Sequence, residues 1–215
     1  MQRAGMGIKK ITTVKPRRIP SQARSRETIE KILGAAEELA ASEGAEAVQV
    51  RRIASSASLP IGSIYLYFPN REAILRAIID RYHARIDADF AAKLEGIQSR
   101  EELLEVVDTA VVQYAQFIRD TPSFLNIWTG SSATRLLSDL SIEDSRRTAE
   151  ILYHAARPYI SQEQAQNAHA GLLICVDIIG SISLIAAGQS KKEGERTIQE
   201  LQKMIRFYVV SLLPG

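Results

Sequence analysis

The segment Val50–Leu75 concentrates side chains whose types and spacing suit hydrogen bonding to another molecule. It contains Gly62, Ser63, Tyr65 and Tyr67 within six residues. A glycine lets two backbones approach closely, and hydroxyl groups donate hydrogen bonds to base edges and to phosphate oxygens. These residues therefore indicate recognition of a nucleic acid.

Two short helices must position these side chains, because a tight break at Ser58–Pro60 divides the segment. The second helix offers Ile64 and Phe68 to a core and leaves its hydroxyl-bearing residues for another surface. This arrangement is typical of a helix-turn-helix, whose second helix enters the DNA major groove. The first helix has one apolar stripe at the spacing i, i+3, i+4 and i+7, formed by Val50, Ile53, Ala54 and Ala57.

A wider set of residues has the order and spacing of a known family. The set comprises Ile32, Leu33, Ala35, Ala36, Leu39, Gly44, Ile53, Ala54, Ala57, Gly62, Tyr65, Tyr67, Phe68, Arg71, Glu72 and Leu75. The run from about residue 28 to residue 75 resembles the N-terminal domain of the TetR family of bacterial one-component repressors. The resemblance implies that Gly62, Ser63 and Tyr65 face the groove, and that Tyr67 and Arg71 bind phosphates.

The predicted DNA-binding residues cover both short helices and the start of the next one. Tyr65 has an alternative place in the core, and Ile61 either touches a thymine methyl or is merely exposed. Backbone N–H groups at Asn70 and Arg71 add a positive helix end. The full set is Gln49, Val50, Arg51, Arg52, Ile61, Gly62, Ser63, Tyr65, Tyr67, Asn70 and Arg71.

Three residues depart from the family's common pattern. Ser58 stands where the turn commonly has glycine, and a left-handed residue there costs about 1–2 kcal/mol more. Pro60 replaces a serine N-cap, although proline is tolerated at a helix start. Gln49 replaces the serine or threonine that caps the first short helix, and glutamine is a poorer cap. These departures bear on DNA affinity.

Composition excludes several classes of protein. The chain has 215 residues, of which 46% are hydrophobic, and its single cysteine, Cys175, cannot form an internal disulfide. We expect a cytoplasmic protein, since the basic N-terminus lacks the apolar core of a signal peptide. The histidines are scattered, so neither a metal site nor a cofactor is expected. His169 and Cys175 point about 240° apart on one helix, and no catalytic motif is evident, so we do not expect an enzyme.

Charge is distributed unevenly along the chain. Residues 1–26 carry eight basic side chains and no acidic one, whereas the net charge of the whole chain is only +2. We interpret residues 1–20 as a basic, flexible arm that either lies near DNA or is a solvated leader without a specific role.

Helical periodicity extends over the rest of the chain, which predicts an all-α fold. A three-helix DNA-binding domain (21–69) is followed by a larger helical domain (70–215) for ligand binding and dimerisation. Ser25 is expected to cap the first helix, and Ser141 and Ser161 are expected to cap two later ones. The expected helices span 27–43, 50–57, 61–68, 71–94, 101–119, 124–128, 142–157, 161–187 and 193–213.

The second domain is expected to hold an effector and to form a dimer. Its most apolar stretch, 170–187, has the length of a membrane span, but we expect burial on two faces instead. Asp177 in that stretch is either a polar handle for a ligand or a partner across the bundle. The resemblance implies a homodimer through about 161–188 and 193–213. The ligand-binding candidates are Tyr114, Phe117, Phe124, Trp128 and Asp177.

The sequence therefore predicts a repressor that binds a palindromic operator in double-stranded DNA. A small hydrophobic or amphipathic ligand would release it by tilting the long helix after Asn70. The alternative is a ligand-independent DNA-binding regulator or architectural protein whose aromatic residues simply fill a core.

Overall fold

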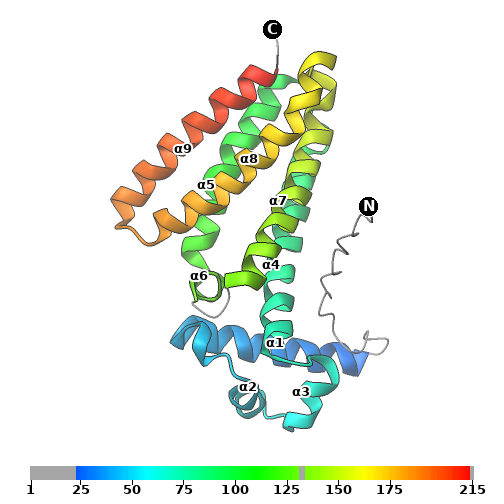
Figure 1. Ribbon diagram of the computed structural model, residues 1–215, viewed down its shortest axis with the longest axis vertical. Helices are drawn as coiled ribbons and strands as arrows, with labels where there is room; N and C mark the ends of the chain where they lie inside the picture. The colour runs from blue at the N-terminus through cyan, green and yellow to red at the C-terminus, as the bar shows by residue number, and fades with distance from the viewer. Residues whose placement is uncertain (1–22, 131–133, 214–215) are drawn as a thin grey trace, which may run out of the picture.

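The computed structural model describes residues 23–130 and 134–213, and within them every regular element is helical. The all-α prediction is confirmed. The predicted basic arm, 1–20, lies outside the described residues. Figure 1 shows a small group of helices at one end of the molecule, from which one long helix rises into a larger bundle. The elements are α1 (Ala23–Glu43), η1 (Ala45–Ala47), α2 (Val50–Ser56), α3 (Ile61–Tyr67), α4 (Arg71–Leu94), α5 (Arg100–Asp120), α6 (Pro122–Thr129), α7 (Thr134–Ala156), η3 (Arg157–Tyr159), α8 (Gln162–Ala187) and α9 (Lys191–Leu212).

The small end of the molecule is built on α1. Its apolar face meets the apolar stripes of α2 and α3, so that Ile32, Ile53, Ile64 and Phe68 are fully buried together. Gly44 ends α1 with a φ of 89°, a conformation that favours glycine. The expected N-cap of α1 at Ser25 is wrong, because the helix is already formed at residue 23.

The long helix α4 begins where the sequence predicted. Asn70 caps it, since the side-chain oxygen of Asn70 accepts a hydrogen bond of 2.9 Å from the backbone N–H of Ala73. The 24 residues of α4 span about 36 Å. Its first two turns bury Ile74 and Ile78 in the core of the small end, and the remainder lies against α5 and α7.

Among the bundle helices, α7 differs most from its predicted start. The helix expected over residues 142–157, with Ser141 as its N-cap, begins eight residues earlier, at Thr134, so that prediction is wrong. The residues before Ser141 contain good helix formers and neither proline nor glycine, so nothing stops the helix there. The last helix begins at Lys191 because Ser190 and Glu193 form a capping box. The predicted capping box at Ser161 is confirmed.

The helices α8 and α9 lie side by side along one edge of the bundle (Figure 1). Both leave large apolar side chains exposed: Ile174, Ile178 and Ile185 on α8, and Met204, Phe207 and Val210 on α9. Among the described residues, α8 alone is long and apolar enough to cross a membrane by length and composition. Only 22% of its most apolar 18-residue stretch is buried within the single chain. Its inner face packs on α5, α7 and α9.

The core of the small end continues into the bundle through α6. Ile118, Phe124 and Ile127 belong to the same buried cluster as the α1 residues. The side-chain amide of Asn126 donates a hydrogen bond of 2.9 Å to the carbonyl of Ala40 in α1. The N-terminal helices are therefore joined to the bundle at two places, through α4 and through the contact between α1 and α6.

Candidate nucleic-acid interface and helical pocket

The outer face of α3 lies at the free end of the molecule (Figure 1). Ile61, Tyr65 and Leu66 on this face are 40%, 42% and 56% exposed. Gly62 is also exposed, with open space where a side chain would stand, and Ser63 is half-buried. The face thus combines small, apolar and hydroxyl-bearing groups, as the sequence predicted. The exposed Leu66 was missed, although its position four residues after Gly62 places it on the same side of a helix as that glycine.

The turn between α2 and α3 contains the left-handed backbone conformation that is energetically unfavourable for a residue other than glycine. Ser58 has a φ of 53°, so a residue with a side chain occupies the left-handed region that favours glycine. Pro60 is the N-cap residue of α3 and provides no side-chain hydrogen bond there. Gln49 likewise gives α2 no side-chain cap, because its amide donates a hydrogen bond of 3.3 Å to the carbonyl of Glu46.

The two arginines of α2 are both exposed, and Val50 beside them is half-buried against the core. Arg52 forms an ion pair of 2.5 Å with Glu43 at the end of α1. Because both partners are solvent-exposed, this pair is worth little to stability. The guanidinium of Arg52 is therefore held near the end of α1.

Arg71 makes contacts within the protein that the sequence did not predict. Its guanidinium donates hydrogen bonds of 2.8 Å to the carbonyl of Val48 and 2.6 Å to the carbonyl of Ala45. The side chain thus fastens the turn before α2 to the first turn of α4. Tyr67 is also mostly buried. Contact of these two residues with phosphate remains a prediction, and their observed contacts are within the protein.

A cavity of about 400 Å³ lies in the bundle between α4, α5, α7 and α8. It brings together Tyr114, Phe117, Trp128 and Asp177, four of the five predicted ligand-binding residues. Phe124 is not in the lining. It is buried beside the cavity, where its ring stacks on Trp128 with centroids 5.4 Å apart. Most of the remaining wall is apolar and includes Ile86, Phe90, Val107, Val111, Leu152, Val176, Ile179, Leu184 and Ile205.

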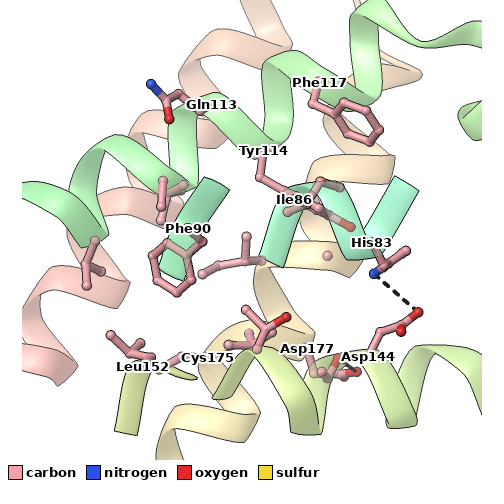
Figure 2. Close-up of a pocket in the computed structure, with 18 of the residues that line it drawn as sticks. His83, Ile86, Phe90, Gln113, Tyr114, Phe117, Asp144, Leu152, Cys175 and Asp177 are labelled. Atoms are coloured by element: carbon pink, nitrogen blue, oxygen red, sulfur yellow. Dashed lines mark hydrogen bonds and ion pairs between the residues drawn. The ribbon is translucent and has the colours of Figure 1, made fainter. Parts of the chain in front are cut away.

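A polar group at one end of the cavity was not found from the sequence. His83 on α4 faces Asp144 on α7, with 3.2 Å between Nδ1 and Oδ2 (Figure 2). Arg147 donates hydrogen bonds of 2.5 Å to Asp144 and to Asp87. Asp87 also accepts a hydrogen bond of 2.7 Å from Thr148. These side chains join α4 to α7 directly beside the cavity.

Burial changes the protonation of this group. It lowers the pKa of His83 to about 4, because the imidazolium form loses its hydration. It raises the pKa of Asp144 to about 6, because the carboxylate form also loses its hydration, although the nearby Arg147 lowers this pKa in part. At neutral pH the imidazole is therefore uncharged and the carboxylate is mostly ionised. Burial also raises the pKa of the Cys175 thiol in the cavity wall to about 11, which keeps it protonated.

Within the described parts of the chain, no three histidine, cysteine, aspartate or glutamate side chains gather as a metal site would require. His169 lies on the same helix as Cys175, as the sequence predicted. Its Nε2 is 2.6 Å from Oε2 of Glu150 on α7.

Comparison with known proteins agrees with this architecture. The family model described as bacterial regulatory proteins, tetR family, matches residues 32–78. A second model, described as tetracyclin repressor-like, C-terminal domain, matches residues 101–212. The chain belongs to the TetR family. Proteins of this family are DNA-binding transcriptional regulators and are generally not enzymes.

The similar curated proteins include repressors named KstR. The one from Mycobacterium tuberculosis is 35% identical over 81 residues, which cover 38% of this chain and 36% of that protein. The one from Mycolicibacterium smegmatis is 40% identical over 63 residues, which cover 29% and 31%. The chain thus matches only about a third of the length of these curated relatives.

Solved structures share the fold over most of the chain. A TetR-family transcriptional regulator from Streptomyces coelicolor has a TM-score of 0.69 at 22% identity, covering 89% of this chain and all of the other. A complex of SmeT with triclosan has a TM-score of 0.57 at 18% identity, covering 86% and 90%.

Proposed function

We propose that the protein is a homodimeric transcriptional repressor that binds a palindromic operator and is released by a small hydrophobic or amphipathic ligand. The proposal rests above all on one observation. The helix α4 forms a wall of the cavity at His83 and Phe90, and its first turn at Arg71 fastens the turn before α2. A ligand that shifts α4 therefore moves the DNA-reading helices with it.

The outer face of α3 is the part proposed to enter the major groove. Its hydroxyl at Tyr65 and its apolar side chains at Ile61 and Leu66 suit base edges, thymine methyls and the sugar-phosphate backbone. Arg51 and Arg52 on α2 lie on the flank, where a cation meets phosphates.

The exposed apolar faces of α8 and α9 are proposed to pair with the same faces of a second copy. Phe207, at 80% exposure, is the most exposed of the large apolar side chains among those described. A two-fold interface would give the two reading heads the symmetry of a palindromic operator, whose half-sites lie about 34 Å, one helical turn of DNA, apart. The partner would also cover the apolar outer face of α8 in the cytoplasm.

The cavity supports a ligand of modest size. Its walls are mostly apolar, with polar groups beside His83 and at the rim, which is the usual pattern for small-molecule sites. The similar SmeT structure is a complex with triclosan, and this supports binding of a small molecule by the protein described here.

The test is binding to the DNA upstream of the gene, followed by gel shift and by fluorescence anisotropy at two salt concentrations. We expect sequence-specific binding that weakens steeply with salt. A chromatin-immunoprecipitation survey of the genome extends the search for operators. Absence of specific, salt-sensitive binding both upstream of the gene and across the genome would overturn the proposal.

A further inference from the structure

The buried charged group beside the cavity, formed by Asp87, Asp144 and Arg147, has one carboxylate more than it has cations. Asp87 and Asp144 share the single guanidinium of Arg147. His83 supplies no charge at neutral pH, since burial lowers its pKa to about 4. The buried group is therefore left with a net negative charge, which is costly in an apolar surrounding unless a cation accompanies it.

The unbalanced charge can be assigned to one atom. Oδ1 of Asp144 accepts the hydrogen bond from Arg147, whereas Oδ2 is buried without any hydrogen-bond donor among the described residues. The Asp144 side chain is only 5% exposed. Its Oδ2 faces the uncharged ring of His83 at 3.2 Å, outside hydrogen-bonding geometry, and Nε2 of that ring is also buried without a partner.

Aromatic rings surround this end of the cavity. Trp128 stacks against His83 with ring centroids 5.8 Å apart. Phe117 and Tyr114 also line the cavity (Figure 2). The faces of such rings attract a cation placed within about 6 Å of them. Negative charge and aromatic rings therefore favour the same kind of ligand group.

Resting on the proposed function, we propose that the effector is a lipophilic organic cation whose ammonium nitrogen binds Oδ2 of Asp144. The ammonium group takes the place of the His83 imidazole at this oxygen and donates the hydrogen bond that Oδ2 lacks. The apolar body extends along α4 towards Phe90 and Leu152. Because His83 belongs to α4 and Asp144 to α7, binding replaces a contact between these helices with a contact to the ligand.

The rim of the cavity also carries charged side chains, which compete with Asp144 for a charged ligand. Lys93 is paired with Asp89 at 2.5 Å, and Arg85 stands exposed beside them. Exposed charges are screened by water and salt, whereas the carboxylate of Asp144 is not. The opposite assignment, in which Arg85 receives an anionic ligand, is one of the outcomes of the test.

Trp128 provides a direct readout, because it is the single tryptophan of the chain and lines the cavity. The full chain is titrated at pH 7.5 with decylammonium, 1-decanol and decanoate, all below the concentrations at which they form aggregates. We expect decylammonium to bind at least ten times more tightly than 1-decanol, and decanoate to bind most weakly. Equal binding of the three, or a preference for 1-decanol or decanoate, overturns the proposal.

A variant tests the assigned atom. Asp144→Asn removes the charge but keeps an acceptor for Arg147, and we expect the affinity for decylammonium to fall at least tenfold while that for 1-decanol stays within twofold. The matched control is Asp120→Asn at the exposed end of α5, which we expect to behave as the unchanged chain does. Equal losses for both ligands in Asp144→Asn would overturn the assignment. Should that variant fail to fold, the series of head groups on the unchanged chain decides.

The same ligands are then added to the operator complex, so that the two proposals fail separately. Cation-selective binding without release of DNA leaves the inference standing and contradicts ligand-controlled release. Release of DNA by 1-decanol or decanoate, without a preference for the cation, supports ligand-controlled release and contradicts the inference of a cationic effector.

Discussion

Replacing Arg71 by methionine separates a structural role of this arginine from a role in DNA binding. The change removes both hydrogen bonds to the turn before α2 but keeps most of the side chain's apolar stem. The carbonyl of Val48 loses a charged donor in a residue that is fully buried. The carbonyl of Ala45 keeps the backbone N–H of Val48 at 3.1 Å, so its loss is smaller.

The magnitude follows from these two losses. A buried acceptor left without its donor costs about 1–3 kcal/mol, and the second, partly compensated loss adds about 1 kcal/mol. We therefore expect the free energy of unfolding of Arg71→Met to fall by about 2–4 kcal/mol. For a chain of this length the midpoint of thermal unfolding then falls by about 5–15 °C. Circular dichroism at 222 nm, recorded in the absence of DNA, measures both quantities.

Arg51→Met is the control, because Arg51 is exposed on α2. We expect its stability to stay within about 0.5 kcal/mol of the unchanged chain. Its binding to the operator should instead lose about one unit of the slope of log K against log salt. If Arg71→Met melts at the original temperature and only reduces the salt slope, the structural reasoning is refuted and Arg71 acts on phosphate alone.

Four further outcomes follow from the same structure. Asn70→Ala should cost about 1 kcal/mol in urea unfolding, through loss of the α4 cap. Ser58→Gly should raise the urea midpoint by relieving the left-handed φ of 53°, by about 0.5–1 kcal/mol, and no gain would contradict this interpretation. Between pH 7.5 and pH 5, the free energy of unfolding of His83→Gln should rise by about 1–2 kcal/mol relative to that of the unchanged chain. The reason is that the lowered pKa of His83 makes the unchanged chain lose stability as the pH falls below the pKa of histidine in the unfolded state. Parallel pH profiles of the two proteins would exclude this. Phe207→Glu should give monomers by light scattering, and an unchanged mass would rule out this face as the proposed interface.

Local patterns predicted the parts of the fold that depend on residues close in sequence. The apolar stripe of α2 and the burial of Ile64 and Phe68 were predicted, because a helical period determines which residues share a face. The Asn70 cap and the unusual backbone at Ser58 were likewise predictable from single positions. The start of α7 was not, because Ser141 resembles a cap but lies within a run that nothing interrupts.

The candidate sites depend more on distant contacts. Arg71 contacts Val48, which lies 23 positions away in the sequence. A local spacing rule therefore cannot distinguish an arginine that hydrogen-bonds to the protein backbone from one that binds phosphate. His83 was discounted because the histidines are scattered, and only the fold brings it to Asp144, on the far helix α7. Phe124 was grouped with the ligand-binding aromatics because it is close to Trp128 in the sequence, but the fold turns its ring towards the core.

The contact between α1 and α6 limits how freely the two halves of such a protein can be exchanged. Asn126 and the buried Phe124 and Ile127 belong to the bundle by sequence, but they complete the core beneath the reading helices. A chimera that joins residues 21–69 of a relative to this bundle would place a foreign α1 on this α6 surface. We therefore expect such hybrids to fold well only when the α6 residues are transplanted together with the head. The N-terminal helices and α6 thus form one packing unit that is discontinuous along the chain, held by contacts between residues about 85 positions apart.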